Sequence, residues 1–224
     1  MIPLKDNIPS KTFPFITIFL IITNFIVFFY EISLGSDIIN FLDIYGFVPK
    51  RLFILKSFYI YKYGTLITSI FLHAGWLHLL GNMLYLWIFG DNVEDMLGHI
   101  KFLFFYIFCG ITGTLAQIII NPLSKIPIIG ASGAIAGVLG AYFIFFPKSR
   151  VLTVVPIFFF IRIIEITSVL FIGFWFIIQF FNGTSSYNLN NIFEGGVAWW
   201  AHIGGFISGF LFSVIFKIRK SISK

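Results

Sequence analysis

Long apolar stretches separated by short polar segments recur along the whole chain, and they limit what it can fold into. Hydrophobic residues occupy 58% of the 224 positions and charged residues only 11%, and 32 residues are Phe. A soluble core of this size cannot hide so much apolar surface, so the sequence predicts an integral membrane protein. The net charge of +6 comes from basic residues scattered between the apolar stretches. They form no long basic patch, which argues against nucleic acid as a partner.

The apolar stretches predict one all-α domain, residues 1–224, with six membrane-spanning helices. A helix needs about 20 apolar residues to cross the hydrocarbon layer. We place the spans at about 13–33, 65–90, 102–120, 130–146, 165–181 and 197–218, after a short polar segment at 1–12. Pro156 disfavours one continuous helix from Val151 to Phe181. We therefore expect Val151 to Ile164 to form a hydrophobic, partly interfacial connector before the fifth span.

Three polar segments are expected to lie outside the spans. Leu34 to Gly64 mixes charged residues with short aromatic groups, which indicates a large structured loop at the membrane interface. Asp91 to Asp95 is interpreted as a solvated acidic turn, and Asn182 to Gly196, rich in Asn, Ser and Gly, as a flexible loop. No small-residue cleavage site follows the first span, which we interpret as a retained anchor.

The distribution of basic residues predicts the orientation. If both termini are cytoplasmic, ten of the 15 Lys and Arg residues lie inside and five outside, which is the expected bias. In this arrangement the second, fourth and sixth spans run in the same direction, so their starts lie at one face of the membrane. Those starts carry His78, Ser132 and His202.

Ser132 lies in GASGAIAGVLG, where a serine is either packing material or a nucleophile. Gly133 and Gly137, with Gly205 and Gly209 in the sixth span, would let the fourth and sixth helices pack backbone to backbone. Such packing would bring the Ser132 hydroxyl within reach of His202, and a neighbouring imidazole activates a serine. Since no Asp or Glu lies near the outer helix ends to complete a triad, we infer a dyad.

The second span carries a further pair of polar residues. His78 and Asn82 are four residues apart and so share a helix face. Polar groups inside a membrane are costly unless they have partners or line a wet cavity. Together with the backbone N–H of Ser132 they could receive a developing oxyanion.

These residues, within HAGWLHLLGN, FGDNVED, GASGAIAG and AHIGGFISG, make the chain resemble the rhomboid family of intramembrane serine proteases over nearly its whole length. The resemblance implies a six-transmembrane-helix rhomboid-like bundle with a large interfacial first loop and neither metal nor cofactor. It implies that Ser132 is the nucleophile, His202 the general base, and His78, Asn82 and the Ser132 N–H the oxyanion-hole donors. Glu94 and Gly98 would match the family's structural E-x-x-x-G. The implied partners are the lipid bilayer and a transmembrane protein substrate cut near its outer end.

Two positions depart from the family pattern. Many relatives carry Trp-Arg where this chain has Tyr63, Gly64 and Thr65, and some carry a Tyr at the position of Ala136 that stacks on the catalytic histidine. Another residue must then orient His202. We also expect the bulky Trp175 and Phe176 of the fifth span either to face lipid or to face the second span, in which case this helix and the Asn182 to Gly196 loop could act as a lateral gate.

Other classes are weighed against this interpretation. A zinc intramembrane protease would need a helical H-E-x-x-H, which is absent, and an aspartyl type would need two Asp within spans. A transporter and a catalytically silent rhomboid-like membrane chaperone stay open. In every case we expect a multi-pass protein, and the cell membrane is its expected location.

Overall fold

A computed structural model describes residues 1–54, 61–157, 160–188 and 196–222. Its longer helices are α1 (Phe15–Ser33), α5 (Trp76–Leu97), α6 (His99–Ile120), α7 (Ser132–Phe145), α8 (Ser168–Asn188) and α9 (Trp199–Ile222). Shorter helical pieces are η1 (Gly35–Asp37), α2 (Ile38–Tyr45), α3 (Arg51–Ile54), α4 (Tyr61–Thr68) and η2 (Ser69–Phe71). The strands are β1 (Ile2–Asp6), β2 (Arg150–Ile157) and β3 (Phe160–Thr167).

The helices are arranged as a bundle around α7. In the described part of the chain, α1, α6, α8 and α9 are long and apolar enough to cross a membrane. A fifth span results if Tyr63–Phe71 and Trp76–Leu97, bent by 89° at a short break, count as one. Helix α7 has 14 residues, or about 21 Å at 1.5 Å per residue, which is short for a layer of about 30 Å. The structure therefore supports four to five full-length spans, and the expected six are not confirmed.

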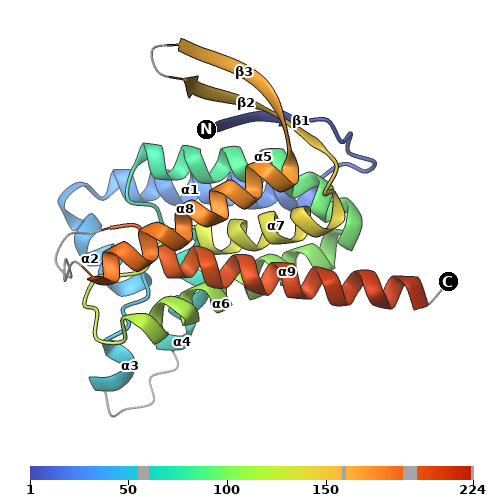
Figure 1. Cartoon of the computed structure of the whole chain (residues 1–224). Coiled ribbons are helices and arrows are strands. Elements are labelled where there is room, and N and C mark those ends of the chain that lie inside the picture. Colours follow the sequence, from blue (N-terminus) through green and yellow to red (C-terminus); the bar gives the residue numbers. More distant parts are fainter. Residues whose placement is uncertain (55–60, 158–159, 189–195, 223–224) are drawn as a thin grey trace.

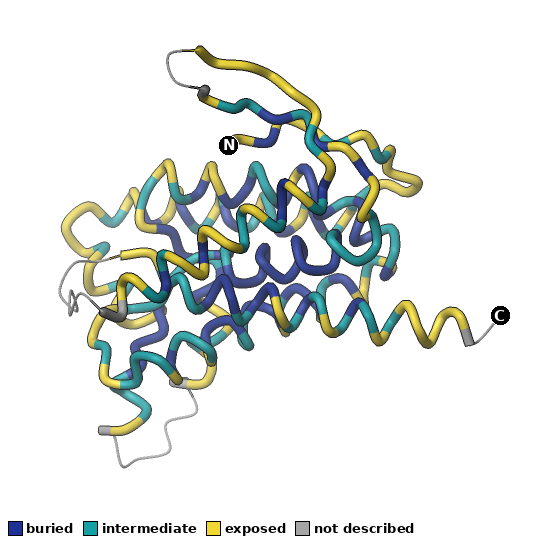
Figure 2. The backbone as a smooth tube through the Cα atoms, viewed as in Figure 1, coloured by how far each residue is buried: buried dark blue, intermediate teal, exposed yellow. Residues whose placement is uncertain are grey.

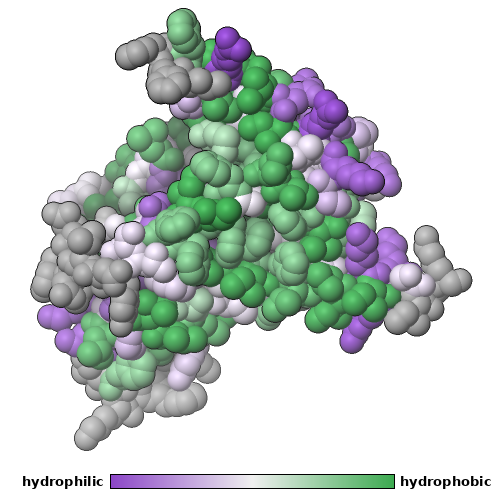
Figure 3. Space-filling view, viewed as in Figure 1, coloured by the Kyte–Doolittle hydropathy of each residue, from purple (hydrophilic) through white to green (hydrophobic). Residues whose placement is uncertain are grey.

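Helix α7 lies at the centre of the bundle, where Figure 2 shows it almost entirely buried. All its residues from Gly133 to Tyr142 are buried. The outward faces of the surrounding helices are apolar instead. In Figure 3, apolar side chains cover the face made by α8 and α9, while hydrophilic ones gather near the base of the sheet and at the carboxyl end of α9. This distribution is the one expected of a protein surrounded by lipid.

Two glycine pairs hold α7 against α9. A Cβ added at Gly205 would lie 2.0 Å from the carbonyl oxygen of Gly133, and one added at Gly209 would lie 2.1 Å from that of Gly137. Backbones approach this closely only where side chains are missing, so the contact depends on glycine at these positions. These contacts fix the position of α7 along α9, and the first of them, at Gly133, lies next to Ser132.

The sheet corrects the all-α prediction. Strand β1 pairs antiparallel with β2, and β2 pairs antiparallel with β3, in the order β1-β2-β3. The amino-terminal segment therefore pairs with the segment that we expected to be an interfacial connector. The paired residues are far apart in the sequence, since Ile2 lies opposite Val154. The run RVLTVVPI of β2 is rich in β-branched residues, which favour strands. Because β3 continues to Thr167, helix α8 begins at Ser168 and not at Glu165 as expected.

The acidic turn after the second span is also a correction. Asp91 to Asp95 are helical and form part of α5, which continues to Leu97 and ends at Gly98, where φ is +82°. Glu94 is fully buried, and its carboxylate accepts the backbone N–H groups of Ile16 and Thr17 at 2.9 and 2.8 Å. These N–H groups have no partner within α1 because they lie in its first turn. A buried carboxylate at that point is stabilised by the helix dipole.

The two remaining loop predictions are only partly covered by the described residues. The segment Leu34 to Gly64 contains η1, α2, α3 and the start of α4, while residues 55–60 lie outside the described part. Its position at a membrane interface stays a prediction. In the segment Asn182 to Gly196, residues up to Asn188 belong to α8, which corrects the expected start of the loop, and residues 189–195 are outside the described part.

Candidate active site

Ser132 begins α7 directly after a sharp turn. Gly130 has φ +115°, a conformation that residues with a side chain rarely adopt. A Cβ at Gly130 would lie 2.6 Å from Nε2 of His78 and 3.7 Å from Nδ2 of Asn82. The backbone can therefore approach these two side chains so closely only because residue 130 is glycine. The turn places the segment that leads into Ser132 against the polar face of α5.

The hydrogen bonds of this face determine which atoms of His78 and Asn82 can donate. The backbone N–H of Ala74 donates to Nδ1 of His78 at 3.4 Å, which leaves the proton of the neutral ring on Nε2. Nδ1 of His73 lies 3.3 Å from the carbonyl oxygen of Phe71, so it carries the proton, and Nε2 of His73 accepts from Nδ2 of Asn82 at 3.0 Å. The amide of Asn82 keeps a second N–H. His78 and Asn82 therefore both have a donor available beside Gly130.

His202 reaches the site from α9. The residue before it, Ala201, has its carbonyl oxygen 3.5 Å from the position of a Cβ on Gly133, the residue after Ser132. His202 is buried, with 8% of its surface exposed. Among the described residues, no hydrogen bond joins the Ser132 hydroxyl to His202. Helices α5, α7 and α9 begin at the same end of the bundle (Figure 1), and His78, Ser132 and His202 lie in their first turns.

The aromatic side chains of α8 do not face the helix that we expected. The rings of Trp175 and His202 are 5.9 Å apart and inclined by 31°, and the ring of Phe176 lies 4.5 Å from that of Phe206. Both residues therefore contact α9. Phe171 of α8 does face α5, and its ring lies 6.3 Å from that of Tyr85. Which way a helix turns its aromatic residues depends on its rotation in the bundle, and a sequence that is apolar all round does not specify this.

Sequence reasoning missed one polar residue at this site. Gln179 of α8 is 5% exposed, and its Oε1 lies 2.8 Å from Nδ1 of His202. A signal for it existed, because Gln179 is the single amide in the apolar run from Ser168 to Phe181. A strongly polar side chain in such a run indicates a functional position.

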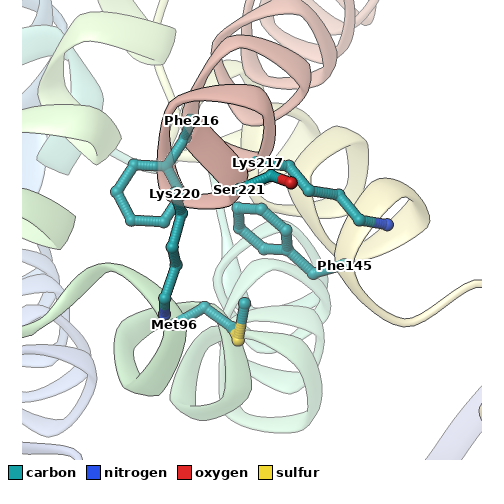
Figure 4. A pocket seen from close by; sticks show the side chains of 6 residues that line it. All are labelled: Met96, Phe145, Phe216, Lys217, Lys220 and Ser221. Carbon is teal, nitrogen blue, oxygen red and sulfur yellow. The ribbon is translucent and has the colours of Figure 1, made fainter. Parts of the chain in front are cut away.

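A pocket of about 240 Å³ lies at the opposite end of the same helices. Figure 4 shows its lining at the ends of α5, α7 and α9: Met96, Phe145, Phe216, Lys217, Lys220 and Ser221. It is remote from Ser132 and does not belong to the candidate active site. Lysines at helix ends extend their charged groups towards water, which accounts for the polar rim. The described residues contain no cluster of three or more potential metal ligands.

Comparison of the sequence with known proteins identifies its relatives. Residues 61–219 match the family model of the rhomboid domain. Rhomboid protease GluP of Bacillus subtilis (strain 168) is 33% identical over 217 residues, which are 97% of this chain and 37% of that protein. Putative rhomboid protease YdcA of the same organism is 42% identical over 81 residues, or 36% of this chain and 40% of YdcA.

A mitochondrial relative is likewise similar over only part of its length. Rhomboid protein 1 of Saccharomyces cerevisiae is 35% identical over 107 residues, or 46% of this chain and 31% of that protein. The chain thus spans between about a third and two fifths of the length of these curated relatives. The residues that match the rhomboid family model, 61–219, include His78, Ser132 and His202.

Proposed function

Because the chain belongs to the rhomboid family, we propose that it is an intramembrane serine endopeptidase whose nucleophile is Ser132 and whose general base is His202. The observation that carries this proposal is the position of Ser132 between two polar groups from different helices. Its preceding turn lies against His78 and Asn82, and the residue after it packs against Ala201, next to His202. A residue with a packing role alone would not need this arrangement on both sides.

The reaction would proceed as acyl transfer. Nε2 of His202 removes the proton of the Ser132 hydroxyl as the oxygen attacks the scissile carbonyl. The oxyanion that develops accepts hydrogen bonds from Nε2–H of His78, from the amide of Asn82 and from the backbone N–H of Ser132. His202 then gives the proton to the leaving amine, and a water molecule, activated by the same imidazole, releases the acyl group. The hydrogen bond between Ser132 and His202 is not formed in this structure and would form when substrate binds, since catalytic contacts are often long or poorly aligned without substrate.

The substrate would be a transmembrane protein. A helix hides its scissile carbonyl in backbone hydrogen bonds, so we expect cleavage near the outer membrane end, at a small residue in a segment that unwinds readily. The bias of the basic residues supports a cytoplasmic location of both termini in the cell membrane. In this orientation α7, the predicted fourth span, would complete the set of six membrane helices and be shielded from lipid by its neighbours, as its burial favours.

The test is proteolysis of a transmembrane reporter by purified protein. Ser132→Ala and His202→Ala should each abolish cleavage without unfolding the protein. The double variant should be no worse than either single one, because the two residues act as a unit. A folded wild type without cleavage of any transmembrane reporter would favour a catalytically silent chaperone, and substantial cleavage by Ser132→Ala would refute the assignment of the nucleophile.

A further inference from the structure

We propose that Gln179 of α8 is the positioning residue that holds the imidazole of His202 in the tautomer and orientation that a general base requires. This inference rests on the proposed function and adds a third residue to the inferred dyad. It also makes α8 part of the catalytic apparatus, in addition to its packing role at the edge of the bundle (Figure 1).

The orientation of the Gln179 amide follows from its second hydrogen bond. Its Nε2 donates to the backbone carbonyl oxygen of Trp175 at 3.0 Å, one turn earlier in α8. A carbonyl oxygen can only accept, so the NH₂ group must point towards Trp175. The opposite orientation would place two oxygens against each other. Oε1 is therefore the atom that faces His202.

The tautomer of His202 follows in turn. Oε1 of Gln179 can only accept, and it lies 2.8 Å from Nδ1 of His202, so Nδ1 carries the proton. In the neutral ring Nε2 is then unprotonated and has a lone pair available, which is the form needed to accept the proton of Ser132. In cysteine proteases with a Cys-His-Asn arrangement, an amide side chain performs this role.

Burial makes the contact effective. Gln179 and His202 are 5% and 8% exposed, so water does not replace the hydrogen bond if it is lost. The ring of His202 is also bounded by Trp175, at 5.9 Å, and by Trp199, at 6.0 Å and nearly perpendicular. The aromatic rings limit the tilt of the imidazole, while Gln179 selects which nitrogen is protonated. Together they replace the tyrosine that some relatives carry at the position of Ala136.

The experiment compares two substitutions of Gln179 with a substitution of another glutamine, which serves as the control. Gln179→Leu keeps a similar volume but has no acceptor, whereas Gln179→Glu restores one. Gln117 of α6 is the control, because its Oε1 also ties α9 to a neighbouring helix, through the backbone N–H of Trp200 at 3.1 Å, without contacting an imidazole. Gln117→Leu should therefore reproduce any loss that comes only from a weaker attachment of α9.

We expect Gln179→Leu to lower kcat for a transmembrane reporter by about 10- to 100-fold, the range found when a residue that orients a metal-binding histidine is lost, with KM changed less than twofold. The rate at which a small fluorophosphonate labels Ser132 should fall by a similar factor, because labelling needs the same base. Gln179→Glu should recover most of both rates. Gln117→Leu should change thermal stability as much as Gln179→Leu does but leave labelling within about threefold of wild type.

A readout that does not depend on activity is ¹⁵N NMR of labelled histidine, with the His202 signals identified by their absence in His202→Ala. In the wild type we expect a protonated Nδ1 and a free Nε2, and in Gln179→Leu a mixture of tautomers. A wild-type His202 with its proton on Nε2 would overturn the inference even if Gln179→Leu did not fold. So would a folded Gln179→Leu enzyme with wild-type kcat, provided that Ser132→Ala is inactive. Failure of the protease assignment itself would instead appear as cleavage by Ser132→Ala.

Discussion

Gly205→Ala is the smallest change that tests whether the contact between α7 and α9 positions the site. The added Cβ would lie 2.0 Å from the carbonyl oxygen of Gly133 and 2.8 Å from its carbonyl carbon. Ordinary contacts begin at 3.4 Å, so the two backbones would have to move apart by about 1.4 Å. Neither neighbour is a flexible side chain that could turn away. The shift must be taken up by the helices themselves.

The cost can be estimated from this displacement. Overpacking a well-packed interior costs about 1–3 kcal/mol, and a clash between backbones lies at the upper end. For a chain of this size, about 3 kcal/mol corresponds to a Tm lower by roughly 6–12 °C. A displacement of about 1 Å between reacting groups costs roughly 100-fold in rate. Gly205→Ala should therefore unfold at lower temperature and cleave a transmembrane reporter about 100-fold more slowly.

Thermal unfolding in detergent and the cleavage rate of the reporter measure the two effects. Gly173→Ala in α8 is the matched control, since a Cβ there would meet no atom within 4 Å and alanine favours a helix by up to about 1 kcal/mol over glycine. Gly35 in η1 also has free space around it, but it is unsuitable as a control because its φ of +54° strains any side chain. If Gly205→Ala matched Gly173→Ala in both Tm and rate, the close contact could not be what positions Ser132.

The other predictions concern the oxyanion donors, the sheet and the gate. His78→Ala should lower kcat by about 10- to 1000-fold while Ser132 stays detectably labelled by a fluorophosphonate, and unchanged turnover would assign His78 to packing alone. Burial raises the pKa of Asp6 in β1 to about 6, although the hydrogen bond from the Tyr142 hydroxyl lowers it in part. The folded state thus holds this proton more tightly than the unfolded state, so stability should fall as pH rises from about 4 to about 6. Asp6→Asn should remove this loss of stability with rising pH, as followed by thermal unfolding. It should stabilise the protein at pH 7.5 by about 1–2 kcal/mol, a value that allows for the partial exposure of the carboxylate. An unchanged pH dependence would contradict this prediction. If α8 is a lateral gate, Phe171→Ala should lower Tm but raise cleavage of a transmembrane substrate, with labelling by a small probe unchanged, whereas equal cleavage would place the gate elsewhere.

The aromatic contacts of α8 also reverse one expectation from the sequence. If Trp175 faced α5, its removal would loosen the gate and raise activity. Because its ring lies beside His202, Trp175→Ala is now expected to lower the rate of Ser132 labelling. A looser gate alone would raise cleavage of a transmembrane substrate and leave labelling by a small probe unchanged, so a labelling assay decides between the two possibilities.

The class of the protein and a set of candidate site residues could be predicted from the sequence because both depend on local pattern. Apolar runs long enough to cross a membrane indicate membrane spans wherever they occur. A hydroxyl among glycines at Ser132 and a glycine repeat around His202 indicate close helix packing, and the structure has these glycines in contact. The bend before Trp76 and the shortness of α7 were not predicted, because a buried helix need not match the membrane thickness.

Only the tertiary structure decided how separate elements meet. The sheet pairs Ile2 with Val154, and no local pattern links segments so distant in sequence. The partner of His202 likewise depends on the rotation of α8, which brings Gln179 to Nδ1 and turns Phe171 towards α5. An apolar helix in a bundle has many rotations of similar hydrophobicity, so its few polar contacts are chosen by packing against neighbours. For this reason the sequence indicated which groups are candidates for catalysis, while packing of the bundle decided which side chain meets Nδ1 of His202.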